Sequence, residues 1–132
     1  MAVALQSRGQ LDEALRIRRE EELPVYERLG DQRERAVTMG KIADVLQSRG
    51  QLDEALRIRR EEELPVYEQL GDQRARLVCW ANQATALLAR GATGDRDEAR
   101  RLFTAAMADA QRMGLPDVEV IADWLKSVDA EP

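Results

Sequence analysis

One 31-residue stretch occurs twice in this chain. Residues 5–35 and 46–76 are offset by 41 positions and differ only at Arg28, which becomes Gln69, and at Glu34, which becomes Ala75. Self-similarity at a period of 20 to 50 residues is the signature of a repeat array, in which each unit stacks on its neighbours. The repetition therefore predicts the architecture. For function it predicts only a binding or assembly scaffold and does not name a ligand.

Hydrophobic periodicity assigns the repeats to helices. Met39, Ile42, Ala43 and Leu46 recur at i, i+3, i+4 and i+7, the spacing of one face of a helix. Helices are expected over residues 1–8, 11–29, 31–49, 52–70, 73–90, 96–113 and 117–128, with no strand. Glycine, which readily adopts the left-handed conformation that closes a helix, is expected to end them at Gly9, Gly30, Gly50, Gly71, Gly91–Gly94 and Gly114. Asp31, Asp72 and Asp95 are the expected N-terminal caps.

The start of the chain is expected to be the last part of a helix. Residues 5–9 repeat the LQSRG that closes a longer helix at residues 46–50, which suggests a fragment of a longer array or an engineered truncation. Leu11, Leu15, Ile17 and the Met39–Ile42 face would then lose part of their cover. A homodimer through this N-terminal end is one expectation. A monomer with a frayed first helix is the alternative.

Two prolines fall in the middle of expected helices. Pro24 and Pro65 lack the N–H that an α-helix needs, and their rings press on the carbonyl groups of Glu20 and Glu61. A widened turn or kink is therefore expected around residues 20–24 and 61–65. It would turn Leu64 inward in place of Arg59 and Glu63.

Composition excludes several classes of function. The net charge is −5, which argues against nucleic acid or an anionic membrane as the main partner. The chain has no histidine, which removes the commonest general base, the usual catalytic triads and most transition-metal sites. We therefore expect no enzyme activity and no cofactor. The single Cys79 is compatible with a reducing compartment, so a cytoplasmic location is expected.

Three other features have a simple structural interpretation. The triplets 20–22 and 61–63 are all glutamate, but consecutive helical residues point about 100° apart and do not converge on one ion, so a solvated face paired with arginine is expected. The acidic residues at the end of the GATGD turn, Asp95, Asp97 and Glu98, lack the ligand pattern of a calcium-binding loop. Cys79 is expected to be a structural thiol, and Trp80, which aligns with Met39, a core residue.

The stretch from Met39 to Leu56 resembles a tetratricopeptide repeat of the longer bacterial type. Positions that match the family pattern are Met39, Ile42, Ala43, Leu46, Gly50 and Ala55, and in the next unit Trp80, Ala84, Leu87 and Ala99. The resemblance covers nearly the whole chain up to about Gly114. The chain departs from the family where Arg18 and Arg59 replace the usual aromatic residue of the second helix.

The resemblance implies a single domain, a right-handed superhelical solenoid of antiparallel helix pairs. Its units would be a truncated repeat at 1–30, repeats at 31–71 and 72–114, and a capping helix at 115–132. It also implies a concave groove, whose candidate residues here are Lys41, Asp44, Gln47, Ser48, Asn82, Thr85 and Leu88. Gly40, Asp44, Ala81 and Thr85 stand where some relatives carry a clamp for a peptide carboxylate, so that activity is not expected.

The resemblance and the repetition suggest two functions. The first is a non-enzymatic scaffold that binds a peptide or protein in the groove, as in arrays of bacterial signalling proteins. The second is a self-assembly module of a larger signalling protein, because identical repeats offer faces that fit one another. The mass in solution would distinguish them, since a groove binder can stay monomeric.

Overall fold

The computed structural model describes residues 2–130, with side chains from Gly9 to Asp129, and the described chain is helical throughout apart from short turns. Its elements are α1 (Ala2–Ile17), η1 (Arg18–Glu22), α2 (Leu23–Leu29), α3 (Gln32–Ser48), α4 (Leu52–Ile58), η2 (Arg59–Glu63), α5 (Leu64–Leu70), α6 (Gln73–Arg90), α7 (Asp95–Met113) and α8 (Asp117–Ala130). No strand occurs between residues 2 and 130, so the expected all-α class is confirmed.

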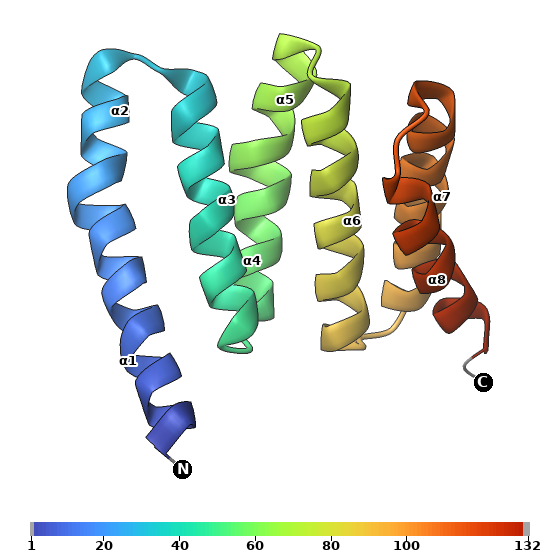
Figure 1. Ribbon diagram of the computed structural model, residues 1–132, viewed down its shortest axis with the longest axis horizontal. Helices are drawn as coiled ribbons and strands as arrows, with labels where there is room; N and C mark the ends of the chain where they lie inside the picture. Colours follow the sequence, from blue (N-terminus) through green and yellow to red (C-terminus); the bar gives the residue numbers. More distant parts are fainter. Residues whose placement is uncertain (1, 131–132) are drawn as a thin grey trace.

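The helices stand side by side in chain order and alternate in direction (Figure 1). The rod formed by α1, η1 and α2 lies at one end, and α7 and α8, which overlap in this view, lie at the other (Figure 1). Neighbours along the chain pack together, as α3 does with α4, α6 with α7, and α7 with α8. In addition, α4 contacts α6, which joins one helix pair to the next.

Two of the inter-helix turns repeat the same capping chemistry. Gly30 and Gly71 both have φ of 68°, a left-handed conformation that costs glycine little and that closes α2 and α5. The next residue then caps the following helix: a carboxylate oxygen of Asp31 accepts the N–H of Glu34 at 3.0 Å, and Asp72 does the same for Ala75 at 3.0 Å. Both expected caps are confirmed.

The expected cap at Asp95 is wrong. Asp95 is the first residue of α7, and the N-cap position is held by Gly94, which makes no side-chain bond there. The Asp95 carboxylate instead accepts two bonds from Arg90, at 2.8 and 2.7 Å, and the N–H of Ala92 at 2.9 Å. Charge-assisted bonds to a guanidinium are stronger than a single cap bond, so the arginine decides the orientation.

The expected helix end at Gly9 is also wrong. α1 continues from Ala2 to Ile17 through Gly9, so the expected helices at 1–8 and 11–29 are one rod. The identical sequence in the second copy does turn, because Gly50 has φ of 79° and separates α3 from α4. In that copy the long helix α3 buries Met39, Ile42 and Leu46 against α4, and this packing stabilises the turn. A glycine alone does not end a helix where no such packing opposes continuation.

The widened turns at the prolines are confirmed. Residues 18–22 and 59–63 form π-helical turns that end two residues before Pro24 and Pro65, slightly earlier than expected. The N–H of Leu64 bonds to the carbonyl of Arg59, five residues back, and Leu23 bonds to Arg18 in the same way. The wider turn lets the helix pass a residue that has no N–H and whose ring crowds the preceding carbonyl groups.

The expected effect on side-chain orientation was wrong. Arg59 is 2% exposed and Glu63 is 5% exposed, whereas Leu64 is only partly buried. The expectation that the glutamate triplet forms a solvated face therefore fails at Glu63. It remains correct for Glu61, which is exposed and pairs with Arg57 at 3.7 Å.

Small residues allow the helices to approach closely. Ala43, Ala55, Ala84 and Ala99 are completely buried in the two larger apolar clusters. One of these clusters joins α1, α3 and α4. The other joins α6, α7 and α8 around Phe103, which stacks on Trp124 with ring centroids 5.9 Å apart. Trp80, which was expected in the core, is only partly buried and packs against the second cluster from its edge.

Candidate functional site

An apolar cleft lies between α6 and α8. Its volume is about 360 Å³, and its lining is mainly hydrophobic: Leu77, Val78, Ala81, Asn82, Pro116, Asp117, Val120 and Ile121. Ligand sites in proteins typically combine such an apolar lining with a few polar groups. Here the polar groups are the Asn82 amide and the Asp117 carboxylate.

The local sequence explains why apolar side chains remain at this surface. In α6, Leu77 and Cys79 are each 1% exposed, but Val78 between them is 40% exposed. In α8, Ile121 is buried against α7, and the preceding Val120 is 59% exposed. Successive helical residues point about 100° apart, so a valine beside a core residue faces the cleft. The sequence has more apolar residues on these helices than the core takes up.

The cleft is bordered by charges of both signs. At its mouth, Arg74 pairs with Asp117 at 3.4 Å. Val78 also lines an adjoining hollow between α3 and α6, which Arg33 and Asp72 border with an ion pair of 2.6 Å. The backbone N–H of Ala75 and the Arg33 guanidinium lower the pKa of Asp72, so this acid stays ionised. A ligand lying along α6 would meet an apolar floor and charged edges.

A buried polar network lies beneath the adjoining hollow and is centred on Arg59. The guanidinium donates to Glu63 at 3.1 Å, to Asp44 at 2.6 Å and to the amide oxygen of Gln47 at 3.2 Å. The Gln47 amide nitrogen then donates to the Thr85 hydroxyl at 3.0 Å. The network therefore connects η2 to both α3 and α6. Arg59 and Glu63 are buried within it, whereas the Asp44 side chain is 63% exposed, and we assign the network a role in positioning the helices.

Glu63 is the most perturbed acid of this network. Burial raises its pKa to about 7 and outweighs the Arg59 guanidinium, which lowers it. The negative charge of Asp44 also raises this pKa. Tyr67 donates its hydroxyl to the Glu63 carboxylate at 3.5 Å. On the other side the carboxylate lies against Gly40, where a Cβ atom would come within 2.5 Å of an Oε atom. A larger residue at position 40 would therefore force the Glu63 carboxylate to shift away from its present contacts.

Cys79 lies beside the same network. Its thiol donates to the Arg59 carbonyl at 3.5 Å, and burial raises its pKa to about 12. A thiol with a raised pKa and no access to solvent is a poor nucleophile. The expected structural role of Cys79 fits this geometry.

The candidate groove residues are divided among several environments. Asn82 lines the α6–α8 cleft, and its carbonyl accepts the Thr85 hydroxyl at 2.9 Å. Asp44, Gln47 and Thr85 belong to the Arg59 network. Lys41 is exposed on α3. Leu88 packs against the core cluster of α6, α7 and α8.

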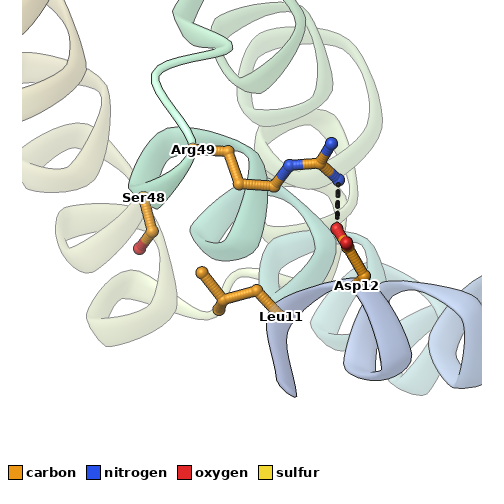
Figure 2. A pocket seen from close by; sticks show the side chains of 4 residues that line it. All are labelled: Leu11, Asp12, Ser48 and Arg49. Carbon is orange, nitrogen blue, oxygen red and sulfur yellow. Dashed lines mark ion pairs between the residues drawn. The ribbon is translucent and has the colours of Figure 1, made fainter. Parts of the chain in front are cut away.

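Ser48 lies in a separate hollow beside α1. Figure 2 shows Leu11 and Asp12 of α1 facing Ser48 and Arg49 at the end of α3, in a hollow of about 360 Å³. An ion pair of 3.2 Å joins Arg49 to Asp12 across it (Figure 2). This pair holds the first rod against α3. Ser48 and Asn82 therefore do not share one site.

Sequence reasoning missed the cleft and the buried arginine, although both left a signal. Val78 and Val120 add apolar residues next to positions already assigned to the core. Arg59 occupies the position where the tetratricopeptide pattern has an aromatic residue, and a charged residue at a core position requires partners. Two of its three partners, Asp44 and Gln47, come from α3, and pairing between helices is not visible in a helical periodicity.

No three acidic or thiol side chains between residues 9 and 129 gather closely enough to hold a metal ion. No described helix combines the length and the apolar character needed to cross a membrane. Comparisons with protein-family models, curated proteins and solved structures gave no significant match to this chain.

Proposed function

We propose that this chain is a non-enzymatic protein-interaction scaffold of the tetratricopeptide kind, which binds an apolar segment of a peptide or protein between α6 and α8. The observation that carries the proposal is the cleft with exposed Val78 and Val120 at its edges. Contiguous exposed apolar surface on a protein marks sites of interaction. The right-handed superhelix of helix pairs is part of the same proposal.

The repeat pattern supports the proposed class. Helices alternate in direction along the array (Figure 1), and fully buried Ala43, Ala55, Ala84 and Ala99 stand at positions where the family uses small residues. In this assignment α6 is the first helix of its pair, and the capping helix α8 follows α7 in the place where the next first helix would stand. The family places its concave groove on such helices, so the cleft lies on the face that the class would use.

The chemistry of the cleft defines the ligand class. Apolar side chains of the ligand would fill the hollow beside Leu77 and Ile121 and replace water there. The Asn82 amide can donate to and accept from a peptide backbone. Arg74 and Asp117 offer both charges at the mouth, so a ligand with mixed charges around an apolar anchor fits best.

Selection from a displayed library of random peptides tests the proposal. The selected peptides would be measured against the wild type and against Val78→Asp, with Val25→Asp as the matched control, since Val25 is a similarly exposed valine on α2. A buried carboxylate in the cleft should weaken binding at least about ten-fold. If Val25→Asp weakens binding as much as Val78→Asp does, or if no peptide depends on Val78, the proposal is wrong.

A further inference from the structure

The first rod has an open face where the second rod has a neighbour. In α4, Ala55 and Ile58 are 0% and 2% exposed because they pack against α3. The identical residues of α1, Ala14 and Ile17, are only partly buried. With Gly9, Gln10 and Glu13 they line an open hollow of about 540 Å³.

The same face is also less enclosed at η1. Arg18 and Glu22 form an ion pair of 2.9 Å, with side chains that are 28% and 32% exposed. Their counterparts Arg59 and Glu63 are 2% and 7% exposed, because α3 supplies Asp44 and Gln47 to the arginine. The face of α1 and η1 thus has the residues to bind a helix like α3, and no described helix covers it.

We infer that this face binds a second copy of the chain, through an antiparallel pairing of the two α1 helices around a two-fold axis near Gly9. Residues 2–8 read AVALQSR and correspond to ADVLQSR at 43–49, the part of α3 that packs on α4. Residues 43–49 pack on α4 of the same chain because the chain turns at Gly50. In α1 the helix runs straight through Gly9, so residues 2–8 do not fold back onto residues 11–17 of the same chain.

The register follows from the hairpin within the chain. Leu46 and Ala55 share one apolar cluster, and the corresponding positions are Leu5 and Ala14. In an antiparallel pair, Leu5 of each copy would lie at the position of Ala14 in the other, which centres the axis between residues 9 and 10. Exchange of an element that has opened at a hinge is a known low-cost route to a symmetric dimer.

Shape and charge favour this occupant. The N-terminal end of α1 projects past the ends of the neighbouring helices (Figure 1), so a second α1 can approach it. Residues 2–8 carry one basic residue, Arg8, and no acidic one, and the open face carries Glu13. In the two-fold arrangement these opposite charges are repeated on both sides of the axis.

Sedimentation equilibrium at micromolar and higher concentrations tests the inference. The wild type should show a dimer, and Ala14→Glu should weaken it at least about ten-fold by placing a charge in the interface. Ala108→Glu is the matched control, because Ala108 is exposed on α7, and it should leave the dimer unchanged. Circular dichroism of the same samples would show that each variant is folded.

A second variant distinguishes the paired helices from a hairpin within one chain. Gly9→Ala favours the straight helix, because alanine adopts the left-handed turn conformation poorly. It should therefore preserve or strengthen the dimer. A wild type that is monomeric throughout, a dimer that Ala14→Glu does not weaken, or a Gly9→Ala variant that becomes monomeric would each overturn the inference.

Discussion

Gly9 and Gly50 occupy the same position in two copies of one sequence, but they adopt different backbone conformations. Gly50 has φ of 79° and joins two helices, whereas Gly9 has no positive φ and lies inside α1. The 13 residues from Leu5 to Ile17 are identical to those from Leu46 to Ile58. Tertiary packing therefore decides whether this sequence turns.

Alanine substitutions at the two glycines should have opposite effects on stability. An added Cβ atom meets nothing within 4 Å at either position, so only the backbone differs. Gly9→Ala should increase helicity and raise the free energy of unfolding by up to about 1 kcal/mol. Gly50→Ala should lower it by about 1 to 2 kcal/mol, the cost of a left-handed alanine. Urea unfolding followed by circular dichroism measures both effects. Effects of the same sign would contradict the different backbone conformations assigned to Gly9 and Gly50.

The repeat also supplies matched variants for the buried arginine. Arg59→Met removes one partner of a buried ion pair and leaves the Glu63 carboxylate without its cation, which should cost about 3 kcal/mol above neutral pH. Arg18→Met breaks a partly exposed pair and should cost under about 1 kcal/mol. Unfolding midpoints in urea give the comparison. Equal losses would mean that burial by α3 does not make the difference.

Gly40 and Glu63 should be energetically coupled. Because a Cβ at position 40 would lie 2.5 Å from Glu63 Oε2, Gly40→Ala should destabilise the protein by about 1 to 3 kcal/mol. In a Glu63→Ala background the contact is gone, and alanine should then be the better helix residue by about 1 kcal/mol. A double-mutant cycle measures this reversal. A background of Glu22→Ala, in the other copy, should leave the penalty unchanged.

Glu63 should also make stability depend on pH. Its pKa is about 7 in the folded protein against 4.5 for a free glutamate, so the folded state binds the proton more tightly. Its contribution is fully present below about pH 4.5 and is lost as the pH rises through about 7, at most about 3 kcal/mol.

Glu63→Gln should remove the decline in the free energy of unfolding as the pH rises through about 7. Glu22→Gln, in the other copy, should leave that decline in place. Acids such as Asp95, whose pKa Arg90 lowers from 3.8, stabilise the fold fully above about pH 3.8 and lose that effect as the pH falls further. They therefore do not mask the change near neutral pH. Urea unfolding across this range gives the free energies. A decline that persists in Glu63→Gln would assign it to another group.

Local sequence signals predicted much of the fold, and contacts between helices decided the rest. The capping aspartates and the prolines each act within a few residues, so the turns at Gly30 and Gly71 and the two π-helical turns could be predicted. The continuation of α1 through Gly9 could not be predicted, because it depends on whether a neighbouring helix is present. The inward orientation of Arg59 was missed for the same reason, since its partners Asp44 and Gln47 lie on α3.

For the candidate site, the sequence indicated the helices but not the cleft. Asn82 was chosen because it lies on the expected groove helix, and it does line the cleft. Leu88 lies on the same helix but is partly buried and packs against the core cluster of α6, α7 and α8. Periodicity defines which residues share a face. It does not show which part of that face a neighbouring helix covers. The position of α8 beside Val78 depends on the packing of α7 and α8, which no local pattern shows.

The most direct test of the proposed function is where a bound peptide contacts the protein. The measurement is a titration of the protein, carrying isotopically labelled valine methyl groups, with a peptide selected for binding, followed by NMR. The account predicts that the methyl resonances of Val78 and Val120 shift in proportion to occupancy, while those of Val25 stay in place. Shifts that leave Val78 and Val120 unchanged would contradict the assignment of the α6–α8 cleft as the binding site.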